Sequence, residues 1–223
     1  MNIIANNVAN MSTPGFRAQN LIFQEVIENP QYMKEDLSMV LDYGQYQNTD
    51  PGPIKMTGNS LDVALVGPGF MGIVTPEGVQ YTRAGNFGLT ADGTLVNARG
   101  MPVASEGGGQ ITIPADADNI YIGQDGTIST DDGAVGKLMV VEFRSEQVLD
   151  PAGNGLYVNE EGGKPAEQTT VLQGKLEGSN VQPVVEMTRM IDVLREYQTV
   201  QNIMQSEHER QRTAIQRLSK SSS

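Results

Sequence analysis

The hydrophobic pattern is clearest near the end of the chain, where residues 184–218 contain neither proline nor glycine. Apolar side chains recur there at helical spacing, and a heptad register places on one seam Met187, Met190, Leu194, Tyr197 and Met204. A helix of this length cannot lie along a small β domain over its whole length, so the seam needs a partner helix. The pattern therefore predicts a long C-terminal helix within residues 184–223 that packs against another helix.

The first residues supply the second helical pattern. Ile3, Ile4, Val8 and Met11 follow helical spacing, and the tetrapeptide at 13–16, Thr-Pro-Gly-Phe, interrupts it. Proline at the second position and glycine at the third favour a type II turn, because glycine tolerates a positive φ. We predict an N-terminal helical segment over residues 1–29 that pairs with the C-terminal helix.

The middle of the chain is patterned as short strands. Apolar runs of strand length lie at residues 62–66, 72–74, 138–143 and 169–172. Three Asp-Gly dipeptides, at 92–93, 125–126 and 132–133, predict hairpins with type I′ turns, whose two central residues need a positive φ.

These patterns predict a mainly β protein with terminal α-helices. We expect a connecting region, extended or β, at 30–65, a central β domain at 66–170 and a return connection at 171–183. The β-rich domain is thus inserted between N-terminal and C-terminal helices, which pair as a coiled coil.

The amino-acid composition excludes several classes of function, although it says less about the fold. The 223 residues include 27 acidic and 15 basic side chains, giving a formal net charge of −12, and no cysteine. Nucleic-acid binding depends on neutralising phosphates with lysine and arginine, so this balance disfavours a nucleic-acid partner. The cysteine count excludes disulfides and thiolate chemistry. Neither a membrane-spanning apolar run nor the pattern of a secretory signal peptide is present, so we expect no membrane insertion and, for an exported protein, another route.

One stretch imitates a nucleotide-binding motif. Residues 67–72 match G-x-G-x-x-G and follow a predicted strand. That motif must open a helix whose N-terminus binds the pyrophosphate, whereas residues 73–78 are patterned as strand and turn, and Pro68 removes a backbone donor. We interpret the motif as a turn and predict no cofactor and no small-molecule substrate.

Metal binding and catalysis have equally weak support. His208 is the one histidine, and without cysteine or a second histidine we interpret it as a polar seam position rather than a zinc ligand. Five aspartates do not fit a calcium-binding loop and are assigned to hairpin turns: Asp116, Asp118, Asp125, Asp131 and Asp132. We predict no metal site and no catalytic residue, and we place Arg83 in solvent or at an interface.

Asparagine clusters near the N-terminus, at Asn6, Asn7 and Asn10. Its side-chain amide competes for backbone hydrogen bonds and weakens an isolated helix. These amides either satisfy backbone groups at the helix end or hydrogen-bond between subunits, and the pattern leaves both readings open.

Four segments together resemble the family of flagellar rod and hook proteins. They are NNVANMSTPGF at 6–16, TGNSLDVAL at 57–65, YTRAGNFGLTADGTLVNARGMPV at 81–103 and EGSNVQPVVEMTRMIDVLREYQ at 177–198. The order of the segments is that of the family, and they span nearly the whole chain. Family members usually carry most of a helix ahead of the first segment, so we expect such a helix to precede Met1 in the natural protein.

The resemblance implies a structural subunit of the flagellar basal-body rod, a periplasmic shaft that transmits torque from the motor to the hook. Its implied partners are copies of itself, other rod proteins and the flagellar type III export apparatus. The expected assembly interface comprises Asn6, Asn7, Asn10, Phe16, Asn180, Met187, Met190, Leu194, Tyr197 and Met204. Two alternatives from other classes are a carbohydrate-binding or adhesin-like β domain and a nucleotide-dependent enzyme.

Overall fold

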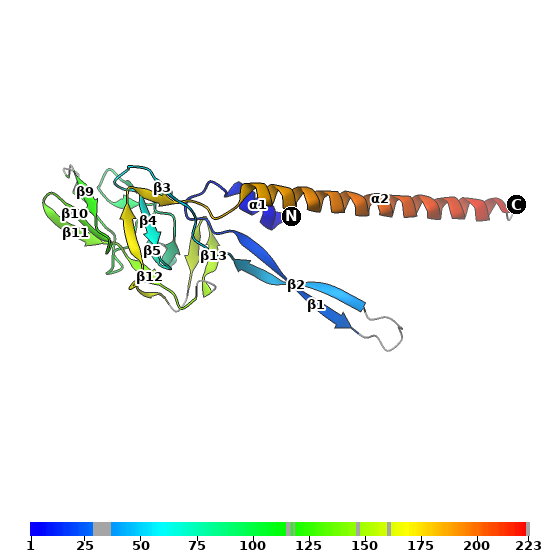
Figure 1. Ribbon diagram of the computed structural model, residues 1–223, viewed down its shortest axis with the longest axis horizontal. Helices are drawn as coiled ribbons and strands as arrows, with labels where there is room; N and C mark the ends of the chain where they lie inside the picture. Colours follow the sequence, from blue (N-terminus) through cyan, green and yellow to red (C-terminus); the bar gives the residue numbers. More distant parts are fainter. Residues whose placement is uncertain (29–36, 115–116, 118, 146–147, 160–161, 222–223) are drawn as a thin grey trace.

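The computed structural model describes residues 1–28, 37–114, 117, 119–145, 148–159 and 162–221. The molecule is elongated, with a β domain at one end from which a long helix and a hairpin extend (Figure 1). The helices are α1 (Asn2–Ala9) and α2 (Pro183–Ser221). In chain order, the strands are β1 (Gln19–Glu28), β2 (Leu37–Gln47), β3 (Ile54–Met56), β4 (Val63–Val66), β5 (Phe70–Thr75), β6 (Gly78–Thr82), β7 (Gly88–Leu89), β8 (Leu95–Val96), β9 (Ile120–Ile122), β10 (Thr127–Thr130), β11 (Gly133–Lys137), β12 (Val140–Glu142), β13 (Asp150–Gly153), β14 (Leu156–Val158), β15 (Lys164–Pro165), β16 (Thr170–Gln173) and β17 (Lys175–Glu177).

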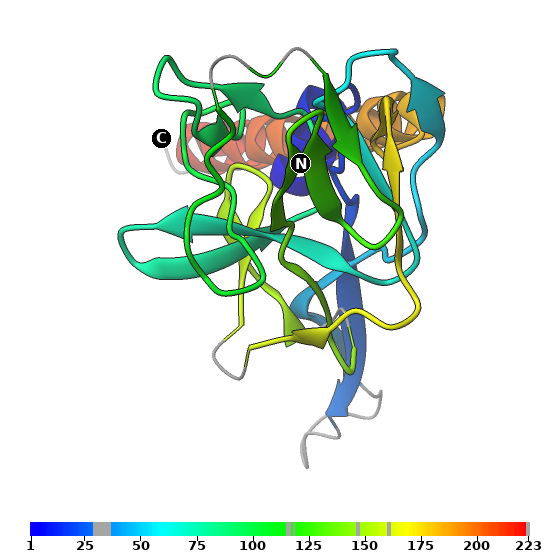
Figure 2. The same cartoon turned by 90° about the vertical axis from the view of Figure 1, so that its left-hand side faces the viewer.

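The β domain consists of small antiparallel sheets around a core to which neither helix contributes. The largest sheet has the strand order β13-β14-β6-β5-β12-β15, and a second has the order β11-β10-β9. Short pairs join β4 to β16, β3 to β17 and β7 to β8. The core is made of fully buried apolar side chains that include Val63, Phe70, Met71, Ile73, Leu95, Ile128 and Leu138. Burying each such side chain contributes roughly 1.5–3 kcal/mol. In Figure 2 the sheets of this domain lie in front, and both helices lie behind them.

The predicted strands are confirmed, since they coincide with β4, β5, β12 and β16. The three Asp-Gly hairpins also exist, but the predicted type I′ turns are wrong, because the aspartates do not have a positive φ. At 90–94 and 123–127 a turn closed by an i to i+3 hydrogen bond ends on a glycine of positive φ, Gly93 (77°) or Gly126 (84°). This is a three-residue hairpin loop with a glycine bulge, which needs only one left-handed residue.

The expected N-terminal helical segment at 1–29 is only partly helical. Helix α1 ends at Ala9, the Thr13–Phe16 turn follows as predicted with Gly15 at a φ of 67°, and residues 19–28 form strand β1. Strand β1 pairs with β2 over its whole length, from Gln19 opposite Gln47 to Glu28 opposite Leu37. Apolar runs of this length do not distinguish helix from strand by periodicity, and here pairing with the next strand of the chain, β2, decides for strand.

The two ends of the chain meet at the base of α2. Helix α1 packs beside the first turns of α2, which then continues well beyond both α1 and the β domain (Figure 1). The prediction of a mainly β protein with a helix at each end is therefore confirmed. Neither helix in the described residues is long and apolar enough to cross a membrane.

Two of the expected domain limits fall inside paired strands. The limit between 65 and 66 cuts β4, and that between 170 and 171 cuts β16, although these strands pair with each other from Val63–Gln173 to Val66–Thr170. Their side chains Val63, Leu65 and Val171 belong to the main core. The packed β unit thus extends beyond 66–170 on both sides, and the division of the chain into domains stays a prediction.

Gly85→Ala is expected to destabilise the β domain, because a Cβ at this position would lie 1.8 Å from the carbonyl oxygen of Val63. Forced backbone shifts of this kind cost about 1–3 kcal/mol, which lowers the melting temperature by roughly 2–4 °C per kcal/mol in a chain of this size. The matched control is Gly88→Ala, whose Cβ would meet nothing within 4 Å. Thermal unfolding followed by circular dichroism tests this, and equal melting temperatures for the two variants would contradict the close approach.

Candidate assembly interface

Three segments that are distant in sequence meet where the chain enters and leaves the β domain. We call residues 15–18, 48–52 and 177–181 the end junction. Its backbone hydrogen bonds run from Gly15 N–H to the Glu177 carbonyl (2.8 Å), from Asn180 N–H to the Phe16 carbonyl (3.2 Å) and from Asn48 N–H to the Ala18 carbonyl (2.8 Å). The junction therefore ties the N-terminal turn to the strand that returns from the β domain.

A buried ion cluster lies at the centre of the end junction. The Glu177 carboxylate contacts Arg17 (Oε1 to Nη2, 3.3 Å) and Arg83 (Oε2 to Nε, 3.0 Å). All three side chains are 1% exposed. Charges this deeply buried are tolerated only when they are paired and hydrogen-bonded.

Backbone groups satisfy much of the remaining hydrogen-bonding capacity of the cluster. Arg17 donates through Nη1 to the carbonyls of Thr49 (2.8 Å) and Asp50, and Glu177 Oε1 accepts from Gly52 N–H (3.0 Å). Arg83 donates through Nη1 to the carbonyls of the loop between β4 and β5, at Gly67 (2.8 Å) and Gly69. The cluster thus joins the N-terminal turn, the segment at 49–52 that precedes β3, the β4–β5 loop and strand β17.

The stretch at 67–72 that imitates a nucleotide-binding motif consists of the β4–β5 loop at 67–69 and the first residues of strand β5. It opens a strand and not a helix, and two carbonyl oxygens of the loop accept hydrogen bonds from Arg83. The dinucleotide-binding motif must open a helix whose N-terminus holds the pyrophosphate, and here a strand follows the loop, so the interpretation as a turn is confirmed.

Phe16 and Asn180, both predicted interface residues, are placed in the end junction. Phe16 is buried against Ala18 and Val181. Asn180 accepts from Ala18 N–H (2.7 Å) and donates to the carbonyls of Asn48 (3.0 Å) and Asp50 (2.8 Å). Its amide therefore holds all three segments of the junction together.

Asn7 joins the two ends of the chain. It is buried, forms a two-way hydrogen bond with the backbone of Gln19 (2.9 and 3.0 Å) and donates to Glu186 Oε2 (3.3 Å) in the first turn of α2. Glu186 also pairs with Arg189 at 2.8 Å. A carboxylate in the first turn of a helix is further favoured by the helix dipole.

Asn6 and Asn10 make polar contacts within the chain. Asn6 donates to Gln19 Oε1 (3.2 Å), and Asn10 donates to the Asn6 carbonyl (2.9 Å). Both line a cavity of about 320 Å³ with Phe16, Arg99 and Tyr157. The contacts seen for these asparagines are intramolecular, and their role between subunits stays a prediction.

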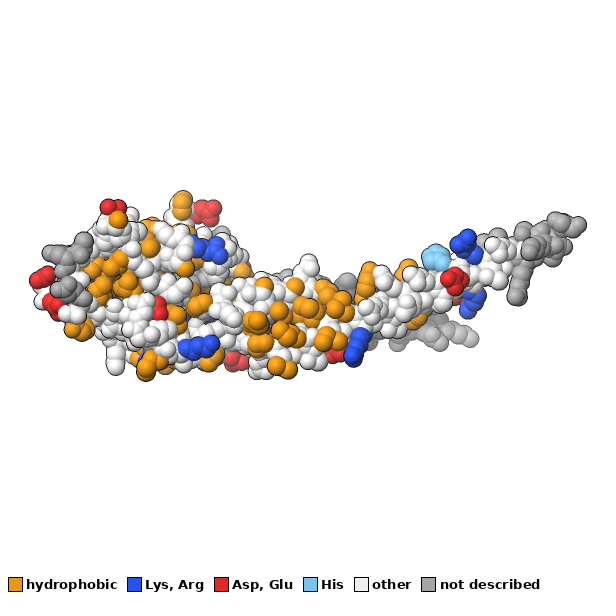
Figure 3. Space-filling model, turned by 90° about the horizontal axis from the view of Figure 1, so that it is seen from above, with side chains coloured by type: hydrophobic (Ala, Val, Ile, Leu, Met, Phe, Trp, Pro, Cys, Tyr) orange, Lys and Arg blue, Asp and Glu red, His pale blue; other side chains and the backbone are white. Residues whose placement is uncertain are grey.

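The five predicted seam residues lie on α2, and most of them are exposed. The exposed fraction is 46% at Met187, 44% at Leu194, 62% at Tyr197 and 58% at Met204, while Met190 is half-buried. Ile191, Val200 and Ile203 are exposed as well. Figure 3 shows hydrophobic side chains gathered along the first half of the helix and charged ones beyond it. We call the exposed apolar side chains in this part of the helix the α2 stripe: Val184, Val185, Met187, Ile191, Leu194, Tyr197, Val200, Ile203 and Met204.

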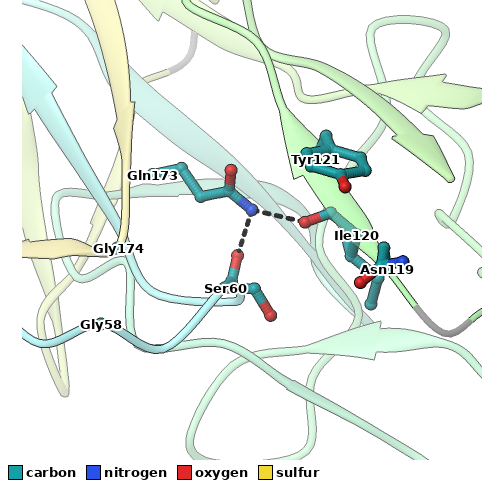
Figure 4. A pocket seen from close by; sticks show the side chains of 7 residues that line it. All are labelled: Gly58, Ser60, Asn119, Ile120, Tyr121, Gln173 and Gly174. Atoms are coloured by element: carbon teal, nitrogen blue, oxygen red, sulfur yellow. Dashed lines mark hydrogen bonds between the residues drawn. The ribbon is translucent and has the colours of Figure 1, made fainter.

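The shallow pocket in Figure 4 is lined by Gly58, Ser60, Asn119, Ile120, Tyr121, Gln173 and Gly174. Gln173 donates from its amide to the carbonyls of Ser60 (2.9 Å) and Ile120 (2.7 Å), which joins the β3–β4 loop to β9. The lining contains no carboxylate, histidine, lysine or arginine, so this pocket lacks a strong acid or base.

Two carboxylates elsewhere have perturbed acidity for structural reasons. Hydrogen bonds from the Thr127 side chain and backbone lower the pKa of Asp125 in its turn. Burial raises the pKa of Glu142, but the hydrogen bonds from the Thr169 hydroxyl and Gln168 N–H together outweigh burial, and its pKa lies below the usual value.

Within the described residues, no group of three or more histidine, cysteine or acidic side chains is arranged to hold a metal. Asp116 and Asp118 lie outside the described residues.

Comparison with known proteins decides the family. Three sequence models match: "Flagella basal body rod protein" at residues 1–17, "Flagellar hook protein FlgE/F/G D1 domain" at 64–130 and "Flagellar basal body rod FlgEFG protein C-terminal" at 172–217. The flagellar basal-body rod protein FlgF of Caulobacter vibrioides is 35% identical over 99% of this chain and 92% of its own length. The chain belongs to the flagellar basal-body rod protein family.

Rod proteins named FlgF and rod proteins named FlgG are similar to this chain to nearly the same degree. FlgF of Rhizobium meliloti is 32% identical over 92% of the chain and 85% of its own length, and FlgG of Bacillus subtilis is 32% identical over 94% of the chain and 89% of its own length. The prediction of a structural rod subunit is therefore confirmed. Its finer form, that the chain is most like the proximal rod protein FlgF with the distal rod protein FlgG as the alternative, agrees with the match to the Caulobacter protein.

The ion cluster is the part of this rod protein that sequence reasoning missed. Arg17 and Glu177 were not singled out, and Arg83 was placed in solvent or at an interface, although it is buried. Each charge lies alone in its own segment, so no spacing in the sequence links the three. The one available signal is that each lies inside or next to a segment that resembles the family.

Glu177→Gln is expected to lower the free energy of unfolding by about 3–5 kcal/mol, because it leaves two buried guanidinium groups without a carboxylate. The control is Glu106→Gln, which breaks the exposed 3.2 Å pair with Lys137 and should cost less than about 1 kcal/mol. Urea denaturation of both variants measures the difference. A loss below 1 kcal/mol for Glu177→Gln would show that the cluster does not hold the junction.

Proposed function

We propose that this rod protein polymerises through its terminal helices, with copies of itself and other rod proteins, into the periplasmic rod that transmits torque from the motor to the hook. The observation that carries the proposal is the α2 stripe. Helix α1 reaches only the first turns of α2, so this chain leaves most of the stripe uncovered. Contiguous exposed apolar patches on soluble proteins mark interaction sites.

The stripe has the chemistry of a helix–helix seam. Four of its members, Met187, Leu194, Tyr197 and Met204, lie at the a and d positions of heptads, where apolar side chains pack against a second helix. We infer that pairing of the terminal helices as a coiled coil begins where α1 meets α2 and that helices of neighbouring subunits cover the rest. Repeated contacts between unlike faces of identical subunits produce helical filaments or tubes.

The family resemblance supports export through the flagellar type III apparatus to the basal body. In this proposal, the terminal segments outside the β domain become fully ordered only when neighbours pack on them. Fixing the backbone of each residue costs roughly 1–2 kcal/mol, which opposes premature polymerisation in the cytoplasm. Burial of the α2 stripe at the growing tip offsets that cost.

Leu194→Asp is expected to abolish rod assembly and swimming, because a carboxylate on the α2 stripe loses its hydration without gaining a partner when helices pack. The purified protein should melt within about 2 °C of the wild type, since substitutions at exposed positions usually change stability by less than 0.5 kcal/mol. Electron microscopy of isolated basal bodies and thermal melting are the two measurements.

Thr199→Asp is the matched control, because Thr199 lies on the polar side of the same helix, where its hydroxyl donates to the Arg195 carbonyl. It should leave rods and swimming intact. Intact rods in the Leu194→Asp strain would refute polymerisation through the stripe.

A further inference from the structure

The ion cluster of the end junction carries an excess positive charge. It holds two guanidinium groups, of Arg17 and Arg83, against the single carboxylate of Glu177, and all three are 1% exposed. Arg17 Nε has no hydrogen-bond acceptor among the described residues. A buried donor on a charged group that lacks its partner is costly, so an anion placed near this cluster would be stabilised.

A cavity of about 420 Å³ opens directly onto the cluster. Arg17, Arg83 and Glu177 line it together with apolar residues, which include Pro51, Ile54, Leu65, Val66 and Pro68. Ile54 and Val66 are 44% and 46% exposed, so the apolar rim is open to a partner. The pocket therefore has an open apolar rim above a base of two buried guanidinium groups and one carboxylate, whose net positive charge fits a carboxylate carried on a short hydrocarbon stem.

This pocket shares one lining residue, Pro51, with a cavity at the start of α2. The second cavity, of about 550 Å³, has other walls that include Pro183, Val184 and Val185. Val184 is 78% exposed and is the first member of the α2 stripe. A neighbouring subunit that covers the stripe therefore lies within reach of the pocket.

We propose that the pocket over Arg17 and Arg83 binds a glutamate or aspartate side chain of a neighbouring rod subunit. The proposal rests on the proposed function, since it needs rod subunits packed side by side. Acidic residues outnumber basic ones by 27 to 15 in this chain, so each copy offers many carboxylates to the next. The contact neutralises the excess charge and covers the apolar rim, and it selects one register between subunits by charge complementarity.

The first test uses propionate, a carboxylate on a short apolar stem, added to the purified full chain labelled with ¹⁵N. The Nε–Hε signal of Arg17 should shift and saturate with propionate, while sodium chloride at equal ionic strength leaves it in place. Val66→Trp, which fills the mouth, should abolish the shift, and Leu89→Trp, at a 40% exposed position on β7, should preserve it. An unmoved signal, an equal shift with chloride or a shift that survives Val66→Trp would overturn the proposal. Tighter binding of inorganic phosphate than of propionate would assign the pocket to a free anion and overturn it as well.

The second test is assembly in cells. Val66→Trp and Ile54→Trp should abolish rods in isolated basal bodies while their melting temperatures stay at the wild-type value, and Leu89→Trp should form normal rods. Rods of normal length in a folded Val66→Trp or Ile54→Trp strain would overturn the pocket. That result would not count against polymerisation through α2, because the Leu194→Asp variant tests polymerisation. The two proposals can therefore fail separately.

Discussion

The contact of Glu177 with Arg17 and Arg83 is the interaction on which the rest of the structure depends. Arg17 follows the N-terminal turn, Glu177 ends the last strand and Arg83 follows β6, so one buried carboxylate joins both ends of the chain to the β domain. Buried ion pairs are weak sources of net stability, but removing one partner is strongly unfavourable. The cluster therefore fixes where the chain enters and leaves the β domain more than how stable that domain is.

Fixing the junction also fixes the direction of the long helix. Asn180 holds the three segments of the end junction, and α2 begins three residues later. Asn7 then anchors the first turn of α2 through Glu186. The helix leaves the body of the molecule with its apolar stripe uncovered, which suits a subunit completed by its neighbours. The β domain, with its own core, is free to serve as a rigid spacer between such contacts.

Sequence patterns predicted the elements whose conformation is set by residues close together in the chain. The absence of proline and glycine identified α2, the Thr-Pro-Gly-Phe turn was placed correctly, and Asp-Gly pairs marked real hairpins. Strand β1 was misread because its partner, β2, is separated from it by the intervening residues 29–36, and pairing decides the conformation of an apolar run. The ion cluster was missed for a related reason: Arg17 and Glu177 are 160 positions apart, and only the fold brings them together. Of the predicted interface residues, Phe16 and Asn180 lie inside the end junction, and their role between subunits stays a prediction.

Hydrogen exchange of the backbone amides in the purified, unassembled chain tests the central claim most directly. The claim is that the end junction folds with the β domain, whereas the outer part of α2 awaits neighbours. The amides of Gly15, Ala18 and Gly52, which bond across the junction, should be protected as strongly as those of Val63 and Leu95 in the core. The amides of α2 beyond Tyr197 should exchange orders of magnitude faster, because an exposed helix without packing opens at little cost. Exchange at Gly15, Ala18 and Gly52 as fast as in outer α2 would contradict the account.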